Sequence, residues 1–335
     1  MKITKNTKIC LSIIVTGKCN LNCEYCHFYA NHDRKKYNRN IDNILFRRYV
    51  DYIKYLQTIT PFVEVRFSGG EPLFMGDELF ELSNYLYKET NIKPYIMTNG
   101  KLLSEEIMEK AKKNNIDSFV VSIENPFVDV AGSVETEKTL KKVIELNNDD
   151  VPINFGMLVV TNEQFNNIEK IADYFYTKIK QIPPLCEMNY LPYKSPNAQQ
   201  FKDLYTNVRN VVKKYNGKTN VSLFPYVVPE YYPNNQDGTE FLTELPIDDK
   251  HGILNISNDE MIKRTEKQMD RSFFEYECPN KECDWYQDCR HIKWVWKMNT
   301  NQISSEQKMK DYCKFKKIIS NAYYDALVGS DENGI

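Results

Sequence analysis

The residues best suited to chemistry in this sequence are its cysteines, since there are nine of them and seven fall into two groups. The first group, Cys19, Cys23 and Cys26, has the spacing C-x3-C-x2-C and directly follows a short apolar segment. Three thiolates can ligate three irons of a cubane cluster and leave the fourth iron open to a small molecule. We find no export signal, so grouped cysteines indicate metal or cluster ligands before disulfides.

Two other interpretations of the first group stay open on the residues alone. A structural zinc site takes four ligands, and His27 could be the fourth, although it adjoins Cys26 where zinc-binding sequences usually separate their ligand pairs. A disulfide with one spare thiol is the other interpretation, and a reducing compartment disfavours it. The four histidines, His27, His32, His251 and His291, form no recognisable ligand spacing.

The second group consists of Cys278, Cys283, Cys289 and Cys313, which are separated by gaps of four, five and 23 residues. Four thiolates can ligate an iron–sulfur cluster completely, and the same ligand set also suits a structural zinc ion. A fully ligated cluster has no open iron. If this group binds such a cluster, we expect electron transfer or structural bracing from it, and no direct binding of substrate.

Strand-like and helix-like segments alternate through the first two-thirds of the chain. The strand-like segments are short, apolar and rich in β-branched or aromatic residues, as buried parallel strands are. This alternation predicts a parallel sheet with helices outside it. We predict an α/β fold with a partial (β/α)6 TIM-like barrel, whose site lies at the carboxyl ends of the strands. The predicted strands are Ile9–Val15, Val63–Ser68, Tyr95–Met97, Ser118–Ile123, Ile153–Val160 and Glu187–Leu191.

The helix-like segments are amphipathic and lie between these strands. Ser104, which two glutamates follow, is typical of a helix N-cap. The predicted helices are Asp42–Gln57, Asp77–Lys88, Ser104–Lys113, Ser133–Asn147, Asn166–Lys178, Ala198–Lys214 and Lys314–Leu327.

The alternation stops after about residue 192, which suggests a division of the chain. We predict a core at 1–192, a connecting region at 193–276 and a cysteine-rich domain with a closing helix at 277–335. Within the connecting region we predict a strand at Asn220–Val227 and a loop rich in proline, asparagine and aspartate at Pro229–Asp249.

Composition and charge exclude some classes of function. The formal net charge is −2, and this near balance argues against a dedicated nucleic-acid binder, which needs a strong basic excess. The sequence has no run of 18 or more apolar residues, so we expect no transmembrane helix. The segment Lys2–Val15 reads as a first strand and not as a signal peptide. These points predict a cytoplasmic protein without nucleic-acid or membrane partners.

Five motifs in chain order resemble the radical SAM (S-adenosylmethionine) superfamily over roughly residues 8–192. The cysteine loop has an aromatic residue, Tyr25, before its last cysteine, and a Gly-Gly-Glu-Pro sequence follows the second predicted strand, both as in that family. Three further motifs end the third, fourth and fifth strands. The five motifs are residues 19–26, 68–72, 98–100, 121–125 and 159–162.

The resemblance implies that the open iron of an N-terminal [4Fe–4S] cluster binds SAM. An electron from a flavodoxin- or ferredoxin-type donor would then cleave SAM to a 5′-deoxyadenosyl radical, which abstracts hydrogen from a substrate. The Gly-Gly-Glu-Pro segment would bind the methionine amine, while Ser122 and Glu124 would face the ribose and carboxylate. The residues implied in SAM binding are Tyr25, Gly69, Gly70, Glu71, Pro72, Asn99, Ser122, Glu124, Val160 and Leu191.

The second cysteine group resembles the SPASM or twitch extension of radical SAM enzymes. A full SPASM domain binds two auxiliary clusters, but Lys293 occupies one expected cysteine position and Phe201–Glu277 contains no cysteine. The resemblance therefore implies one auxiliary [4Fe–4S] cluster, ligated by Cys278, Cys283, Cys289 and Cys313.

SPASM-type relatives mostly modify peptides, so the resemblance implies a peptide maturase that forms crosslinks or epimerises residues. Cys186 could donate hydrogen to a substrate radical, although core packing also explains it, as it does Cys10. A leader peptide would have to bind the core, the loop at 229–249 or a separate protein. Two alternatives stay open: a small-molecule radical SAM dehydrogenase or cofactor-biosynthesis enzyme, and a non-catalytic zinc or iron–sulfur module.

Overall fold

The structure is a computed structural model of the 335-residue chain. It describes residues 2–23, 26, 34–123, 136–156, 158–160, 162–183, 185–187, 196–219, 240–249, 252–274 and 306–328. The predicted strand at 220–227 lies outside the described residues.

A six-stranded parallel sheet, with the strand order β5-β4-β3-β2-β1-β8, forms the centre of the molecule. Strand β1 is buried almost throughout, because six of its nine residues are Ile, Leu, Val or Cys and it lies between β2 and β8. The strands are β1 Lys8–Thr16, β2 Val63–Gly69, β3 Tyr95–Thr98, β4 Ser118–Val121, β5 Ile153–Phe155 and β8 Glu240–Leu245.

Two short strands, β6 Leu158–Val160 and β7 Leu185–Glu187, form a separate parallel pair. The prediction of one strand over Ile153–Val160 is therefore wrong, because the chain leaves the main sheet at Gly156. The Gly156 N–H donates to the Val121 carbonyl oxygen at 2.7 Å, so the last pairing with β4 ends there. A glycine inside a strand-like run is a common sign of such a break.

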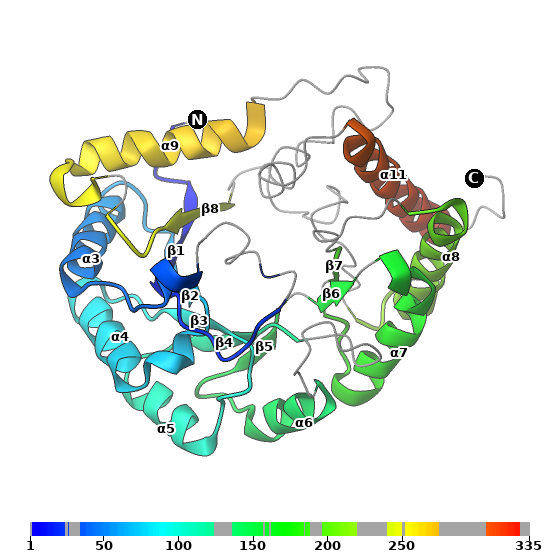
Figure 1. Ribbon diagram of the computed structural model, residues 1–335, viewed down its shortest axis with the longest axis horizontal. Coiled ribbons are helices and arrows are strands. Elements are labelled where there is room, and N and C mark those ends of the chain that lie inside the picture. Colours follow the sequence, from blue (N-terminus) through cyan, green and yellow to red (C-terminus); the bar gives the residue numbers. More distant parts are fainter. Residues whose placement is uncertain are drawn as a thin grey trace.

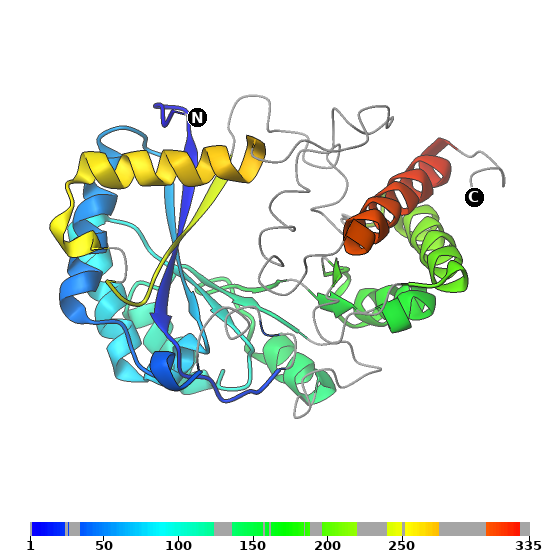
Figure 2. The ribbon, with the colours of Figure 1, turned by 45° about the horizontal axis from the view of Figure 1, so that its top comes forward.

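The helices lie round the outside of the strands, and Figure 1 shows α3, α4, α5 and α6 following one another along one arc. Figure 2 shows α8 and α11 side by side on the opposite side of the molecule. The α-helices are α2 Arg34–Tyr37, α3 Asn43–Gln57, α4 Asp77–Thr90, α5 Glu105–Lys113, α6 Thr136–Leu146, α7 Ile168–Ile179, α8 Ala198–Tyr215, α9 Asn258–Phe274 and α11 Glu306–Val328. Short 3-10 helices are η1 Pro72–Met75, η2 Asn162–Asn167 and η4 Ile253–Asn255.

Side-chain caps fix where several of these helices begin. The Asp42 carboxylate accepts hydrogen bonds from the first N–H groups of α3. The Ser104 hydroxyl accepts one from Ile107 N, which confirms the predicted cap of α5. Asn197 and Gln200 form a reciprocal capping box at α8. Because each cap satisfies backbone donors that would otherwise lack a partner, the helix starts follow from local sequence.

Two hydrophobic clusters hold the fold together. The larger one lies between the main sheet and α3, α4 and α5, where Phe46 of α3 packs edge-on against Phe67 of β2 with ring centroids 5.9 Å apart. The second one joins α7, α8 and α11, where Phe165 stacks on Phe315 at 5.7 Å. The closing helix therefore packs against the second half of the barrel.

The connecting region contributes to the core, which corrects the prediction of a loop over Pro229–Asp249. Within this predicted loop, Glu240–Leu245 form β8, which pairs in parallel with β1. The helix α9, which the sequence reading did not predict, follows β8 and lies against α3. The Tyr52 hydroxyl of α3 and the Thr265 hydroxyl of α9 share a hydrogen bond of 2.8 Å.

The predicted α/β fold with a parallel sheet and a partial barrel is confirmed. Because every described strand pair is parallel, the carboxyl ends of the strands lie along one edge, where sites in such folds form. None of the described helices is both long and apolar enough to cross a membrane.

Candidate functional site

The loop that carries the first cysteine group leaves β1 and is closed at its base. Residues 15–17 run antiparallel to residues 39–41, so the chain returns to the point it left. Gly17 N donates to the Arg39 carbonyl oxygen at 2.9 Å, and the Thr16 hydroxyl donates to Oδ1 of Asn40 at 2.9 Å. The cysteines therefore lie on a loop whose two ends are fixed to each other.

The Gly-Gly-Glu segment after β2 packs directly against the base of this loop. Gly70 N donates to the Thr16 carbonyl oxygen at 2.8 Å, and Glu71 N donates to the Lys18 carbonyl oxygen at 2.7 Å. A Cβ atom at Gly70 would lie 2.2 Å from the Lys18 oxygen, and one at Gly69 would lie 2.1 Å from the Thr16 oxygen. Both glycines are thus needed for a close approach of the chain to itself, immediately before Cys19.

The Glu71 side chain is fully buried and joins three segments. Its Oε1 accepts from the Thr98 hydroxyl at 2.8 Å and from Leu73 N at 3.1 Å. Its Oε2 accepts from Asn99 N at 2.8 Å. Burial raises the pKa of Glu71 to about 7, although these hydrogen bonds oppose the rise. In this arrangement the carboxylate connects the end of β2 to the end of β3, with Pro72 beside it as the buried first residue of η1.

Asn99 connects the end of β3 to the cysteine loop. Its side-chain amide nitrogen donates to Oδ1 of Asn20 at 2.8 Å, and its own Oδ1 accepts from Lys101 N at 3.0 Å. Asn20 is the residue after Cys19, so the loop is held from β3 as well as from β2. The sequence reading did not single out Asn20, and its position between two cysteines was the available signal.

The remaining residues implied in SAM binding are placed only in part. Ser122 follows β4, with an exposed side chain and with its N–H bonded to the Thr98 carbonyl oxygen at 2.9 Å. Val160 ends β6, and only its backbone is described. Tyr25, Glu124 and Leu191 lie outside the described residues. These assignments stay predictions.

The three loop cysteines are partly buried. Cys19 Sγ accepts from Leu21 N at 3.4 Å, and Cys26 N donates to the Cys23 carbonyl oxygen at 3.2 Å. Within the described part of the chain, no group of three or more histidine, cysteine, aspartate or glutamate side chains is arranged to hold a metal ion. The donor set nevertheless fits a three-thiolate cluster in number and type. Metal sites commonly form only when the metal binds, so assembly of the cluster would bring the three thiols together.

The second cysteine group is represented by one residue. Cys313 lies in α11 and is partly buried. Cys278, Cys283 and Cys289 lie outside the described residues. Cys186 lies in β7 opposite Val159 of β6, with only its backbone described.

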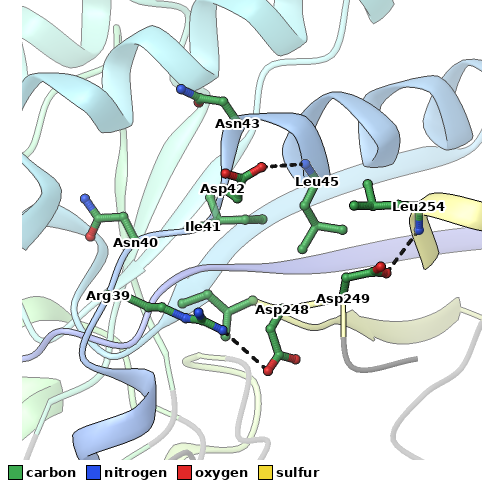
Figure 3. A pocket seen from close by; sticks show the side chains of 10 residues that line it. Arg39, Asn40, Ile41, Asp42, Asn43, Leu45, Asp248, Asp249 and Leu254 are labelled. Carbon is green, nitrogen blue, oxygen red and sulfur yellow. Dashed lines mark hydrogen bonds and ion pairs between the residues drawn. The ribbon is translucent and has the colours of Figure 1, made fainter. Parts of the chain in front are cut away.

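A pocket of about 530 Å³ adjoins the base of the cysteine loop, between residues 39–45 and the segment after β8 (Figure 3). Arg39 and Asp248 form an ion pair of 3.5 Å across it. Two further aspartates in its wall accept backbone hydrogen bonds: Asp42 caps α3 by accepting from Ile44 N, and Asp249 accepts from Leu254 N at 3.0 Å. These acidic groups are therefore already used to fix the fold at this edge.

The fold and this site define a partial α/β barrel with a three-cysteine loop after its first strand and a Gly-Gly-Glu-Pro segment after its second. Residues 13–175 match the family model described as the radical SAM superfamily. The matched segment, just under half of the chain, resembles the radical SAM superfamily, and that family implies SAM and a [4Fe–4S] cluster as cofactors.

Curated relatives match roughly half of the chain. An uncharacterized protein of Methanocaldococcus jannaschii, MJ0907, is 33% identical over 175 residues, which are 49% of this chain and 57% of the relative. The radical SAM cyclopropyl synthase TigE of Paramaledivibacter caminithermalis is 27% identical over 56% of this chain and 43% of its own length. A probable GTP 3′,8-cyclase of M. jannaschii is 27% identical over 59% of this chain and 63% of its own length.

Solved structures match nearly the whole chain in fold. A structure of anSMEcpe with bound AdoMet has a TM-score of 0.70 and 17% identity, covering 97% of this chain and 96% of the other. Streptococcus suis SuiB bound to its precursor peptide SuiA has a TM-score of 0.55 and 14% identity, covering 90% of this chain and 74% of SuiB. At these identities the likeness shows the fold.

Proposed function

We propose that this chain is a radical SAM enzyme that reductively cleaves SAM and abstracts a hydrogen atom from a peptide substrate. One observation carries the proposal: the loop with Cys19, Cys23 and Cys26 is fixed against the Gly-Gly-Glu segment and against Asn99. Two strand ends thus hold the loop at the edge of the barrel where sites form. The same edge presents the exposed Ser122 side chain, which is free to bind a ribose or carboxylate oxygen.

The residues of this site have separate tasks in the proposal. Cys19, Cys23 and Cys26 would hold the cluster and leave one iron for SAM. When bound, cluster and SAM would supply a 5′-deoxyadenosyl radical, with the electron coming from a flavodoxin- or ferredoxin-type donor. Gly70 and Glu71 hold the backbone beside the loop, and the barrel keeps water from the reacting groups.

An auxiliary [4Fe–4S] cluster at Cys278, Cys283, Cys289 and Cys313 is part of the proposal. The match to anSMEcpe supports a full-length relation, because it covers 97% of this chain in fold, well beyond residues 13–175. Cys313 lies in α11, which packs on α8, so a cluster bound there would be fixed to the barrel.

A peptide substrate is favoured over a small molecule by the structures that share the fold. Native anSMEcpe with AdoMet and the Cp18Cys peptide has a TM-score of 0.64 and covers 96% of this chain. SuiB with its precursor peptide covers 90%. The expected reactions are a thioether or carbon–carbon crosslink, or an epimerisation with Cys186 as the hydrogen donor.

A small-molecule substrate is the second candidate. It is favoured by the relatives named GTP 3′,8-cyclase, of which one from Methanococcus aeolicus is 27% identical over 74% of this chain and 80% of its own length. A short precursor-peptide gene beside this one would favour the peptide, and a cofactor operon would favour the small molecule.

Anaerobic reconstitution with iron and sulfide tests the proposal. We expect about eight irons per chain, as two cubanes require, and 5′-deoxyadenosine release from SAM under reductant. Cys23→Ser should abolish the release. Cys10→Ser is the matched control, because Cys10 lies inside β1 with its Sγ 3.1 Å from the Tyr95 hydroxyl, and serine keeps that contact. Bound zinc without SAM cleavage would instead identify a non-catalytic module.

The substrate class is tested with peptides encoded near the gene. Turnover with a substrate peptide should change its mass by the loss of two hydrogens, or add deuterium from D₂O in an epimerisation. If no such peptide changes while GTP or another small molecule is consumed, the second candidate replaces the first.

A further inference from the structure

The two faces of the main sheet differ in chemistry. Alternate residues of the strands, among them Leu11, Val65 and Phe67, form one hydrophobic cluster with residues of α3 and α4. These helices lie outside the sheet (Figure 1). The intervening strand residues project from the opposite face, because side chains alternate along a strand. On β1, β2 and β3 this inner face includes Ser12, Glu64, Arg66, Ser68 and Tyr95, several of which keep part of their surface open to solvent.

Arg66 is held in place at the middle of this inner face. Ser12 is its partner in the register between β1 and β2, and the Arg66 Nε–H donates to Ser12 Oγ at 2.8 Å. Ser12 Oγ and Ser68 Oγ share a further hydrogen bond of 2.7 Å. Ser12 therefore holds the guanidinium at Nε, and Ser68 in turn braces the buried Ser12 side chain. The nitrogens Nη1 and Nη2 keep four N–H donors for another group.

The acidic neighbour on the same strand does not neutralise Arg66. Glu64 pairs with Lys8 at 2.9 Å instead. Among the described side chains, Arg66 has Ser12 as its hydrogen-bond partner. A partly buried arginine whose outer edge faces the inside of a barrel is suited to a bidentate hydrogen bond with an anionic oxygen pair.

The position of Arg66 relative to the cysteine loop defines how a ligand would reach the reacting group. Gly69 lies three positions further along the strand, which is a distance of about 10 Å. A group held at Arg66 would therefore lie below the Gly-Gly-Glu segment, with room for a side chain or backbone between the two points. Residues of this kind position a substrate and do not react with it.

We propose that the inner face around Arg66, braced by Ser12 and Ser68, binds one carboxylate of an acidic residue in the peptide substrate. This inference rests on the proposed function and adds a substrate class to it. The local charge favours a carboxylate over a polyphosphate. One arginine serves a single negative charge, because the nearby Lys8 is already paired with Glu64 and leaves Arg66 to bind an anion on its own.

A peptide selection on the reconstituted full chain with SAM tests the proposal. The probe is a random-sequence peptide library displayed on its encoding nucleic acid. We expect peptides captured by the wild type to be enriched in aspartate and glutamate at one position. Arg66→Gln should lower this enrichment at least about tenfold, because a hydrogen bond to a charged group is lost. Arg66→Lys, which keeps the charge but not the planar fork, should give an intermediate enrichment and serves if the glutamine variant does not fold.

Arg47→Gln is the matched control, since it removes the same charge from an exposed arginine of α3 that lies over the ring of Tyr85 in α4. Its enrichment should equal that of the wild type. No acidic enrichment in the wild type, or the same enrichment with Arg66→Gln, would overturn the proposal. GTP binding that Arg66→Gln abolishes, without any acidic preference among peptides, would assign the arginine to a phosphate and overturn it too.

Release of 5′-deoxyadenosine distinguishes failure of this inference from failure of the proposed function. SAM cleavage without peptide does not need Arg66, so Arg66→Gln should release 5′-deoxyadenosine at the wild-type rate. If the wild type releases none, the proposed function fails, while the selection still decides whether Arg66 binds carboxylates.

Discussion

The side-chain amide of Asn99, at the end of β3, donates a hydrogen bond of 2.8 Å to Oδ1 of Asn20, the residue that follows Cys19. The same residue donates its backbone N–H to the buried Glu71 carboxylate. One asparagine thus connects the cysteine loop, the Gly-Gly-Glu segment and the third strand. A loop held at several points loses less conformational freedom when it binds a cluster, so the fold prepares the site before any metal arrives.

Removing either asparagine side chain should loosen the cysteine loop. Asn20→Ala and Asn99→Ala should each lower the free energy of unfolding by about 1 kcal/mol, measured by urea denaturation without iron. Because the two side chains share one hydrogen bond, the double variant should lose about 0.5 kcal/mol less than the sum. Asn20→Ala combined with Asn197→Ala, which removes the distant cap of α8, should be additive. Additive losses in the first pair would contradict the contact.

Glu71 should make stability depend on pH. Its folded pKa is raised to about 7 from an ordinary value of 4.5, because burial disfavours the charged form. The folded state therefore holds the proton more tightly, and its stability is fully present below pH 4.5 and lost as the pH rises through 7. Relative to Glu71→Gln, the wild type should lose about 3 kcal/mol between pH 4.5 and 8. Parallel curves of unfolding free energy against pH for the two proteins would contradict this.

Gly70→Ala should displace the segment beside the cysteine loop. The added Cβ would lie 2.2 Å from the Lys18 carbonyl oxygen, and neither backbone can move without breaking the bonds that join them. We expect a loss of about 3 kcal/mol in unfolding free energy and a lower yield of reconstituted cluster. Gly217→Ala is the control, because its Cβ meets nothing within 4 Å and only its positive φ costs about 1 kcal/mol. Equal losses in the two variants would show that no close approach exists.

The second cysteine group should bind iron independently of the first. Cys283→Ser combined with Cys289→Ser should lower the iron content after reconstitution from about eight to about four per chain. Cys186→Ser should leave it at about eight, because we propose hydrogen donation and not ligation for that residue. An iron content of about four in the wild type, unchanged by the double substitution, would rule out the auxiliary cluster.

Local signals in the sequence predicted much of the fold. The cap at Ser104 depends on residues within one helical turn, so its neighbours reveal it. The parallel sheet follows from the alternation of apolar strands and amphipathic helices. The strand β8 was hidden, because its residues become a strand by pairing with β1 about 230 residues earlier in the chain.

The site was predictable only in its residue types. The spacing of the cysteines and the Gly-Gly-Glu-Pro sequence indicated a place at the strand ends, and the structure brings the two segments together there. The steric role of the Gly-Gly pair could not be predicted from the sequence. The backbone that these glycines approach, just before Cys19, lies some 50 residues earlier in the chain. The contact of Glu71 with Thr98 likewise joins two strand ends, which no local pattern specifies.

The central claim is that the loop cluster has one iron without a protein ligand and that SAM binds there. Electron–nuclear double resonance on the reduced protein, with SAM labelled with ¹⁵N at its amino group, tests this directly. We expect a ¹⁵N hyperfine coupling to the cluster that disappears in Cys23→Ser and persists in Cys10→Ser. A reduced cluster that shows no coupling to the labelled nitrogen in the wild type, at saturating SAM, would contradict it.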